Sequence, residues 1–428
     1  MSTPFRIAIA GLGTVGAGTV RLIAENADLL AARAGRRIEI AAVSARTRSA
    51  DRGVDLAPFA WEDDPAALAG RGDVDAVVEV IGGVGGAGEA AVRAALAAGK
   101  PVVTANKALM AEHGLQLAKT AEAAGVALRF EAAVAGGIPV IKALSEGLAA
   151  NRTRRIMGVL NGTCNFILTE MEARGAAYGD ILAEAQRLGY AEADPAFDVG
   201  GMDAAQKLAL LAAVGFGAWV PMSALNVEGI AAVTLEDIRT ARDLGFSIKL
   251  LGTAEWSGAA LEVRMQPCLV PAGSALGLVE SVTNMIVIDG DFVGQTVHEG
   301  PGAGSGPTAS AVVADILDIA AGARRPTFGL PAEMLTSPEI ATVGAPAAYY
   351  LRLALDDRPG TLAEVAAALG QHGVSIDQMR QTRHETEDAP VVMITHTCPR
   401  AAIDAALAEI GALAACRATP VAYRIETL

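Results

Sequence analysis

The sequence predicts an α/β protein with a doubly wound parallel sheet at its N-terminus, a mixed α+β middle and a small ferredoxin-like unit at its C-terminus. Over the first 130 residues, continuously apolar strand-type runs alternate with helical patterns, and such strands belong to a parallel sheet that is covered on both faces. Residues 347–428 follow the order βαββαβ, which is the ferredoxin-like order. The segment between these two parts shows neither of these patterns of secondary structure.

The N-terminal domain is expected to span residues 1–130 and to be completed by residues 309–340. Its strands are expected at Phe5–Ala10, Ile38–Ser44, Val74–Ile81 and Pro101–Thr104. A helix of 3–4 periodicity is expected to follow the first strand as far as Leu30. An Ala-rich helix, Glu89–Ala98, is expected to end at Gly99, since glycine suits the left-handed position after a helix.

The middle domain is expected to span residues 131–308. Its clearest elements are two helices and two strand-like runs, at Tyr178–Leu188, Met202–Val214, Leu261–Leu269 and Met285–Ile288. A Gly-rich loop at 300–307 then leads into a strongly apolar helix, Ala309–Ala320. The proline-bearing segment Arg324–Pro346 predicts a linker.

The C-terminal unit is expected to be separate from the rest of the chain. Its strands are expected at Tyr349–Leu355, Val374–Met379, Val391–Thr395 and Thr419–Arg424, and its helices at Leu362–Leu369 and Ala401–Ile410. A turn at 356–360 joins the first strand to the first helix.

The charge balance argues against a nucleic-acid-binding protein. Lysine and arginine number 34 against 48 acidic residues, which gives 34 − 48 = −14, and a broad basic surface is not available to hold phosphates. The four cysteines are far apart and form no CxxC pair, so neither a disulfide framework nor a zinc signature is predicted. Reduced thiols indicate the cytosol.

A membrane segment is not expected. The N-terminal apolar run carries one arginine and is soon broken by glycine, which makes it a poor signal peptide. The uncharged stretch Leu208–Leu225 is near the length of a membrane span. Because Gly215, Gly217 and Pro221 interrupt it and alanine dominates it, we expect a buried helix followed by a loop.

A glycine fingerprint, GxGxxG, follows the first strand directly and opens the first helix. It consists of Gly11, Leu12, Gly13, Thr14, Val15 and Gly16. The first glycine permits a tight turn, the second lets the backbone approach a pyrophosphate, and the third lets helix and strand pack closely. Amides at the helix N-terminus then face the phosphate charge. This context predicts a Rossmann-type site for a dinucleotide.

Two arginines favour NADP over NAD. NAD-preferring sites place an acid at the end of the second strand, but here Arg46 and Arg48 follow that strand and no acid occurs before Asp51. A guanidinium group suits a 2′-phosphate because it can donate two parallel hydrogen bonds. The alternative, that these are ordinary solvated surface arginines, stays open, and so does NAD.

Two lysines and a group of carboxylates are the candidate catalytic residues. Lys107 follows a buried-type strand at its carboxyl end, where ligands of open α/β sheets bind. Asp203 and Lys207 share one helix face, and the preceding loop supplies Glu192, Asp194 and Asp198. A lysine held by carboxylates at the mouth of a buried helix can serve as a proton donor. A solvated lysine and a surface ion pair are the alternatives.

These residues resemble the homoserine dehydrogenase family. The family signature is matched by Ala185, Gly189, Tyr190, Ala191, Asp194, Pro195, Asp198, Val199, Gly201, Asp203 and Lys207. The glycine fingerprint, the Asn106–Lys107 pair, the segment 161–163 and the run 131–139 also resemble that family. The C-terminal unit resembles an ACT regulatory domain through its DxPGxL turn, at Asp357, Pro359, Gly360 and Leu362.

The resemblance implies an enzyme that interconverts L-homoserine and L-aspartate 4-semialdehyde. It implies that Lys207 donates and accepts the proton, that Lys107 lies near the nicotinamide, and that Glu192 binds the substrate ammonium while Asp203 and Asp198 orient it. Further substrate contacts are expected from Asn161, Gly162 and Thr163, and further coenzyme contacts from Ile81, Gly82, Asn106 and Gly304.

The resemblance also implies ligands and partners beyond the substrate. A monovalent-cation site, with sodium as the expected ion, would use Glu131, Val134, Gly136 and Ile138. Threonine is the expected effector of the ACT domain, a homodimer or homotetramer is the expected assembly, and the middle domain would carry substrate binding and dimerisation.

Two other classes of function remain as alternatives. A phosphorylating semialdehyde dehydrogenase would use Cys164 as a nucleophile, but it needs a base beside the thiol, and a buried, inert cysteine fits better. A nucleotide-binding sensor that is not an enzyme would need none of Lys107, Lys207 and Glu192.

Overall fold

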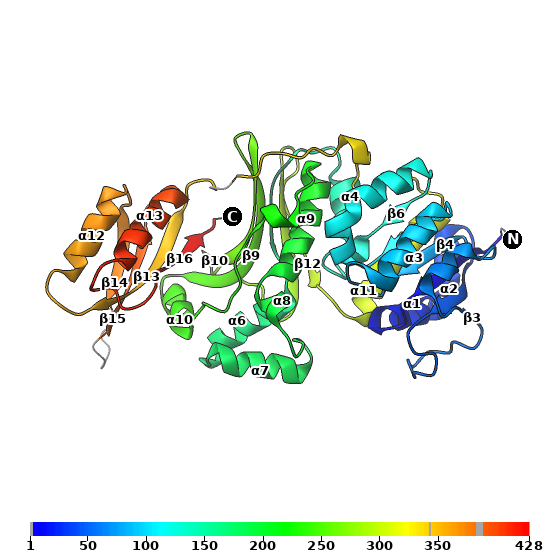
Figure 1. Cartoon of the computed structure of the whole chain (residues 1–428), viewed down its shortest axis with the longest axis horizontal. Helices are drawn as coiled ribbons and strands as arrows, with labels where there is room; N and C mark the ends of the chain where they lie inside the picture. Colours follow the sequence, from blue (N-terminus) through cyan, green and yellow to red (C-terminus); the bar gives the residue numbers. More distant parts are fainter. Residues whose placement is uncertain (1–2, 342–343, 382–387, 428) are drawn as a thin grey trace.

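The structure is a computed structural model that describes residues 3–341, 344–381 and 388–427. Figure 1 shows an elongated molecule in three parts. The N-terminal part (blue to cyan) lies at one end, a central part built mainly from green segments follows, and the C-terminal unit (orange to red) lies at the other end.

The N-terminal sheet is parallel and doubly wound, as predicted. Its six strands have the order β3-β2-β1-β4-β5-β6. They are β1 (Phe5–Ala10), β2 (Ile38–Ser44), β3 (Ala60–Trp61), β4 (Ala76–Glu79), β5 (Val102–Thr104) and β6 (Leu128–Arg129). The strand order reverses between β1 and β4, and ligands of such sheets bind at that point, outside the carboxyl ends of the strands.

The helices of the N-terminal part come from both ends of the first 320 residues. They are α1 (Thr14–Glu25), α2 (Ala27–Ala34), α3 (Gly86–Ala97), α4 (Lys107–Ala123) and α11 (Ser305–Ala320). Helix α11 packs beside α1 and shares its apolar core, with Val312 and Ile316 in the same cluster as Val20 and Ile23. The late helix therefore returns to the first sheet.

The single helix expected as far as Leu30 is wrong. Two helices, α1 and α2, replace it, and Asn26 ends the first and precedes the second. The Asn26 backbone leaves the helical region at φ −110° and ψ 19°, while its N–H still bonds to the carbonyl of Leu22. Asparagine favours such breaks because its short polar side chain competes with helical backbone bonds.

The central sheet runs without interruption into the C-terminal unit. Its strand order is β12-β11-β7-β9-β10-β16-β13-β15-β14, with β8 beside β10. The strands of the central part are β7 (Thr153–Val159), β8 (Asn226–Val227), β9 (Phe246–Ser257), β10 (Ala260–Pro271), β11 (Thr283–Gly290) and β12 (Gly294–Pro301). Strand β10 pairs in parallel with β16 through Cys268 opposite Arg424 and Leu269 opposite Ile425.

The C-terminal unit has the predicted ferredoxin-like order. It comprises β13 (Ala348–Asp356), α12 (Thr361–Gln371), β14 (Ile376–Gln381), β15 (Asp388–Thr395), α13 (Arg400–Gly411) and β16 (Val421–Ile425). It has an apolar core of its own, which includes Leu351, Val365 and Ile403, and the shared sheet and buried ion pairs also join it to the central part. Arg264 on β10 pairs with Glu426, which also accepts from Arg424 at 2.7 Å.

The segment Arg324–Pro346 packs against the rest of the chain and is not a free linker in its described residues. Phe328 is 1% exposed and its ring lies 5.3 Å from that of Phe130 and 5.9 Å from that of Trp219. Thr336 forms a bridge with Ala218. The prolines signalled an irregular segment, but the aromatic side chain anchors it.

The remaining helices surround the central sheet. They are α5 (Val140–Lys142), α6 (Gly162–Arg174), α7 (Tyr178–Leu188), α8 (Ala196–Val199), α9 (Met202–Phe216) and α10 (Leu235–Asp243), with short turns η1 (Pro65–Gly70), η2 (Glu131–Ala133), η3 (Ala143–Gly147), η4 (Met222–Ala224) and η5 (Ala332–Met334). The prediction of a buried helix and a loop for Leu208–Leu225 is confirmed, because α9 ends at Phe216. Within the described residues, no helix has the length and apolar character needed to cross a membrane.

Candidate active site

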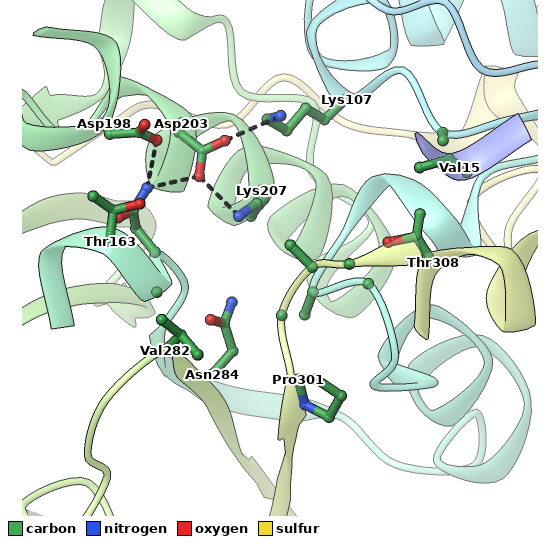
Figure 2. Close-up of a pocket in the computed structure, with 18 of the residues that line it drawn as sticks. Val15, Lys107, Thr163, Asp198, Asp203, Lys207, Val282, Asn284, Pro301 and Thr308 are labelled. Carbon is green, nitrogen blue, oxygen red and sulfur yellow. Dashed lines mark hydrogen bonds and ion pairs between the residues drawn. The ribbon is translucent and has the colours of Figure 1, made fainter. Parts of the chain in front are cut away.

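A cavity of about 680 Å³ lies where the N-terminal sheet meets the central part. Its walls come from the glycine loop after β1, the loops after β4 and β5, the start of α6, the loop before α8, helix α9 and the loop 301–304. Figure 2 shows Lys107, Asp203, Lys207, Asn284 and Thr308 around this space. The cavity therefore lies at the carboxyl edge of the parallel sheet, as expected for a ligand site of this fold.

Lys107 and Lys207 meet at one carboxylate. The Nζ atom of Lys207 donates to Oδ2 of Asp203 at 2.8 Å, and Nζ of Lys107 lies 3.0 Å from Oδ1 of the same side chain. Asp203 and Lys207 lie one helical turn apart on α9, whereas Lys107 is the first residue of α4 in the N-terminal part. The two lysines, separated by a hundred positions, thus converge on one carboxylate.

Asn161 connects Asp203 to a second carboxylate, Asp198. Its Oδ1 accepts from the N–H of Cys164 and so caps α6, while its Nδ2 donates to Asp198 at 2.9 Å and to Asp203 at 3.0 Å. The cap fixes the amide so that both of its N–H donors point at the two acids. Asn161, Asp198 and Asp203 therefore form one network with the two lysines (Figure 2).

The pKa values of the two acids in this network, Asp198 and Asp203, are shifted in opposite directions. Burial would raise the pKa of Asp203, but Lys207 and Lys107 outweigh it and hold that pKa well below its usual range. Burial raises the pKa of Asp198 despite the hydrogen bond from Asn161. Asp203 is therefore the carboxylate that balances the two ammonium groups.

Lys207 keeps a donor for a ligand. An ammonium group has three N–H donors, and within the described residues Lys207 uses one on Asp203 and one on the carbonyl of Leu160 at 2.7 Å. The side chain of Asn284 donates to the same carbonyl at 2.9 Å. The third donor of Lys207 can bind an oxygen in the cavity, which Lys207 helps to line.

Glu192, Gly162 and Thr163 also line the cavity. Glu192 is exposed and lines the cavity. A Cβ atom at Gly162 would lie 2.7 Å from the carbonyl oxygen of Val282, so this turn requires glycine. The Thr163 hydroxyl donates to the carbonyl of Tyr190 at 2.6 Å and joins the start of α6 to the signature loop.

The glycine fingerprint has the expected geometry. Gly11 has φ +105°, and a Cβ at Gly16 would lie 2.0 Å from the carbonyl oxygen of Gly11, so the third glycine lets α1 approach β1. Gly13 precedes α1, and no side chain in the described part of the chain caps the first amides of this helix. Val15 lines the cavity. These free amides can bind a phosphate.

Leu12 and Thr14 of the fingerprint contact other segments. The carbonyl of Leu12 accepts from Arg52 at 3.0 Å, and that of Thr14 accepts from the Ser305 hydroxyl at 2.9 Å. Gly304, with φ +119°, directly precedes α11 and lines the cavity. The loop 301–304 therefore bridges the glycine loop and the central part.

Arg46 and Arg48 lie outside the cavity, in the exposed loop after β2. The Arg48 guanidinium is 5.6 Å from the centre of the Trp61 ring. The sequence analysis missed Arg52, which donates to the carbonyls of Leu12 and Ala50 and ties this loop to the glycine loop. The only signal for it was a third arginine six positions after Arg46.

Ile81, Gly82 and Asn106 lie together at the ends of β4 and β5. Ile81 and Gly82 line the cavity. Asn106 caps α4 by accepting from the N–H of Leu109 at 3.0 Å, and its Nδ2 donates to the carbonyl of Gly83 at 2.7 Å. The sequence analysis missed Glu79, which binds this same loop, although an acid at the end of a buried strand was visible.

The Glu131 carboxylate is held by backbone amides. Its two oxygens accept from the N–H groups of Ile141 and Lys142 at 2.9 and 2.8 Å, and burial with nearby Asp315 raises the pKa of Glu131 to about 8. The described residues contain no cluster of three acidic, histidine or cysteine side chains that would hold a metal.

The loop after Glu131 remains a candidate for carbonyl ligands. Val134 and Ile138 are buried, and Gly136 lines the cavity with φ +47°. The carbonyl of Ile138 accepts from the N–H of Val140 at 2.8 Å. A cation here would depend on carbonyl oxygens, as sodium and other hard cations can.

Cys164 does not have the surroundings of a nucleophile. It is buried, and its Sγ donates to the carbonyl of Asp198 at 3.3 Å. Burial raises the pKa of the thiol, with Asp198 and Asp203 acting in the same direction. Since a nucleophilic cysteine needs a lowered pKa, this environment argues against the semialdehyde dehydrogenase alternative.

The chain is similar to known proteins along its whole length. Three family models match it: "Homoserine dehydrogenase, NAD binding domain" over residues 11–131, "Homoserine dehydrogenase" over 139–317 and "ACT domain" over 349–415. A homoserine dehydrogenase from Neisseria gonorrhoeae is 43% identical over 434 residues, covering 99% of each chain.

Solved structures agree with these matches. A homoserine dehydrogenase from Thiobacillus denitrificans superposes with a TM-score of 0.94 at 41% identity and covers 99% of each chain. A hyperthermophilic archaeal homoserine dehydrogenase in complex with NADPH superposes with a TM-score of 0.65 at 26% identity, over 76% of this chain and 100% of that one.

Proposed function

Since the chain belongs to the homoserine dehydrogenase family and is an NAD(P)-dependent oxidoreductase, we propose that it interconverts L-homoserine and L-aspartate 4-semialdehyde with NADP as the preferred coenzyme. This reaction serves the branch of amino-acid biosynthesis that leads to threonine, methionine and isoleucine. The observation that carries the proposal is the convergence of Lys107 and Lys207 on Asp203, in the cavity that the glycine loop also lines.

Lys207 is the proton donor and acceptor in this proposal. The bound coenzyme supplies a hydride to the aldehyde carbon or accepts one from the alcohol carbon. The aldehyde oxygen gains negative charge as hydride arrives, so it needs a proton and a positive neighbour. Lys207 can donate that proton through its third N–H, and in the alcohol direction its neutral amine accepts the proton of the hydroxyl.

Lys107 and Asp203 support this step. Lys107 places a second positive charge near the same oxygen, and Asp203 balances both ammonium groups so that they can lie together in a buried site. The ion pairs at 2.8 and 3.0 Å support this arrangement. Asn161, which also donates to Asp198, donates to the same oxygen of Asp203 that Lys207 binds.

Glu192 binds the ammonium group of the amino-acid substrate in this proposal. A zwitterionic substrate needs one negative group in the wall, and Glu192 is an exposed carboxylate that lines the cavity. Thr163 and the start of α6 lie beside it and suit the substrate carboxylate, because helix N-termini favour negative charge.

The coenzyme preference rests on Arg46 and Arg48. The described loop after β2 offers two exposed arginines where an NAD site would place an acid. The archaeal relative was solved in complex with NADPH. A 2′-phosphate would bind these guanidinium groups, while Arg52 holds their loop against the glycine loop.

The ACT domain supports regulation by an amino acid, and we expect threonine. A cavity of about 260 Å³ surrounds its turn, lined by Asp357, Gly360 and Thr361. The Thr361 hydroxyl is buried and has no hydrogen-bond partner among the residues that the structure describes, and Thr361 begins α12. A buried hydroxyl without a partner costs free energy, which a carboxylate ligand at this helix start would recover.

A homodimer or homotetramer and a sodium ion bound by loop 134–138 complete the proposal. Sedimentation with and without sodium, together with a titration of activity with sodium and potassium, tests both.

The decisive experiment is a steady-state assay of homoserine oxidation with each coenzyme, with and without threonine. Reduction of NADP that depends on L-homoserine supports the proposed function. Absence of turnover with both coenzymes, in a preparation that still binds NADPH, contradicts it.

A further inference from the structure

Glu79 is a fully buried carboxylate at the carboxyl edge of the N-terminal sheet. It is the last residue of β4 and has an exposure of 0%. Strand β4 lies beside β1, where the strand order reverses and ligands bind. Within the described residues, no cationic side chain forms an ion pair with Glu79. A buried carboxylate without a counterion is costly unless hydrogen bonds compensate it.

Three donors compensate this carboxylate. Its Oε1 accepts from the backbone N–H groups of Ile81 and Gly82 at 2.8 and 2.9 Å, and its Oε2 accepts from the Thr104 hydroxyl at 2.5 Å. Every partner is a donor, so the site is complementary to a group that only accepts, as a carboxylate does.

The network continues from Thr104 to the residue before Lys107. The Thr104 hydroxyl accepts from the backbone N–H of Asn106 at 3.0 Å. Asn106 in turn donates to the carbonyl of Gly83 and caps α4, whose first residue is Lys107. Glu79 thus ties together the loop after β4 and the turn after β5, and both loops line the cavity.

The surrounding backbone is shaped to admit this side chain. A Cβ atom at Gly88 would lie 2.9 Å from Oε1 of Glu79, so any other residue there would displace this carboxylate. Gly82 and Gly83 have φ values of +87° and +86°, which ordinary residues rarely adopt. The loop therefore holds a conformation in which two consecutive N–H groups point back at the carboxylate.

We propose that Glu79 is a positioning residue for the hydride-transfer site. It holds the loop 81–83 against the coenzyme and, through Thr104 and Asn106, keeps Lys107 within reach of Asp203. This inference rests on the proposed function, because it concerns the same cavity and the same lysine. It adds a residue that does not line the cavity, since Glu79 acts through its neighbours.

The test uses isosteric variants that remove one link at a time. Glu79→Gln replaces one acceptor oxygen by a donor amide, which then faces the Thr104 hydroxyl. Thr104→Val replaces the hydroxyl by a methyl group, whereas Thr104→Ser keeps the hydroxyl. Glu122→Gln is the matched control, because Glu122 also accepts a backbone N–H, from Ala332, but lies in the last turn of α4, away from the cavity.

Coenzyme affinity and turnover separate positioning from stability. We expect Glu79→Gln to raise the NADPH Kd, measured by fluorescence, about tenfold and to lower kcat by about ten- to a hundredfold, as loss of a charge-assisted network predicts. Thr104→Val should lower kcat with a smaller change in Kd, and Thr104→Ser should recover most of it. The double variant with Glu79→Gln and Thr104→Val should lose less transition-state stabilisation than the sum of the two single variants. Both changes break the same chain of hydrogen bonds.

Hydrogen exchange gives a readout that does not depend on turnover. The amides of Ile81 and Gly82 should exchange faster in Glu79→Gln and remain slow in Glu122→Gln. The inference is overturned if Glu79→Gln lowers only the melting temperature and leaves Kd, kcat and these amides unchanged. If the wild-type chain does not oxidise homoserine, the proposed function fails, while the Kd and exchange measurements still decide the role of Glu79 at the coenzyme loop.

Discussion

The ammonium group of Lys107 lies 3.0 Å from a carboxylate oxygen of Asp203, although the two residues belong to different parts of the molecule. Lys107 begins α4 beside the parallel sheet, and Asp203 lies in the first turn of α9 in the central part. The contact therefore crosses the cavity. Any movement that separates the two parts breaks this ion pair.

Replacing Lys207 by methionine should abolish most turnover. The substitution keeps the length of the side chain but removes the proton donor, and general acid catalysis contributes about 10²- to 10⁴-fold. We expect kcat for homoserine oxidation to fall within that range, with the NADPH Kd within about threefold of wild type because Lys207 lies away from the glycine loop. A kcat close to that of wild type would show that another group moves the proton.

Replacing Asp203 by asparagine should reduce both stability and activity. The variant leaves two ammonium groups without their shared carboxylate, and breaking a buried pair costs about 3 kcal/mol. The folded-state pKa of Asp203 is lowered, so its stabilisation is complete above the ordinary pKa near 3.9 and is lost as pH falls towards the lowered value. Urea unfolding should show a wild-type advantage at pH 7 that shrinks below about pH 4. An advantage that does not depend on pH would contradict this assignment.

The arginines after β2 should set the coenzyme preference. Replacing both Arg46 and Arg48 by alanine should raise the KM for NADP about ten- to a hundredfold, since each hydrogen bond to a charged group is worth roughly 1.5–3 kcal/mol. The KM for NAD should change little, because NAD has no 2′-phosphate. The exposed Arg33 on α2 offers a control substitution. Equal losses with both coenzymes would mean that the arginines support the loop only.

Removing one hydroxyl group tests whether the effector binds in the cavity of the ACT domain. Thr361→Val keeps the shape of the side chain and removes the buried hydroxyl, which no described residue binds. We expect the threonine concentration for half-inhibition to rise at least tenfold, with homoserine oxidation in the absence of threonine maintained. Point substitution is preferable to deletion after Pro346, because deletion would remove Glu426 from buried Arg264 and leave β10 without β16. Unaltered inhibition in the variant would place the effector elsewhere.

The sequence predicted the elements whose patterns are local. Strand β1 and helix α7 have the predicted bounds, because a short apolar run and a strong helical periodicity are readable within one window. The convergence of Lys107 and Lys207 was predictable only through the family resemblance, since their meeting depends on how two domains pack. The helical spacing predicts that Asp203 pairs with Lys207. It does not predict that Asp203 also pairs with Lys107.

Features set by tertiary contacts could not be predicted in the same way. The pairing of β16 with β10 uses two residue pairs, which leave no periodic mark in the sequence. Glu79 looked like any acid at a strand end, and its role depends on three donors from two loops. The cation expected near Glu131 stays a prediction. The bonds that its carboxylate accepts from the amides of α5 depend on how the loop between them folds back, which leaves no local pattern.

Lys249 should make stability depend on pH in the alkaline range. Burial lowers the pKa of Lys249 to about 8, although Glu172 and Glu280 oppose the shift. Between about pH 8 and the ordinary lysine value near 10.4, the unfolded chain binds a proton that the folded chain does not, so the free energy of unfolding should rise with pH. The rise can reach about 3 kcal/mol at 1.36 kcal/mol per pKa unit.

Lys249→Met should remove this rise, whereas Lys119→Met, at an exposed position of α4, should keep it. Urea unfolding of the three proteins at pH 7.5, 9 and 10 measures the effect as a difference between each variant and wild type, which cancels the titration of other groups. The methionine also loses the hydrogen bonds of Lys249 to Asn165 and Val279. That loss lowers stability at every pH, so only the slope identifies the titration. Parallel slopes for Lys249→Met and wild type would mean that the buried amine keeps its proton.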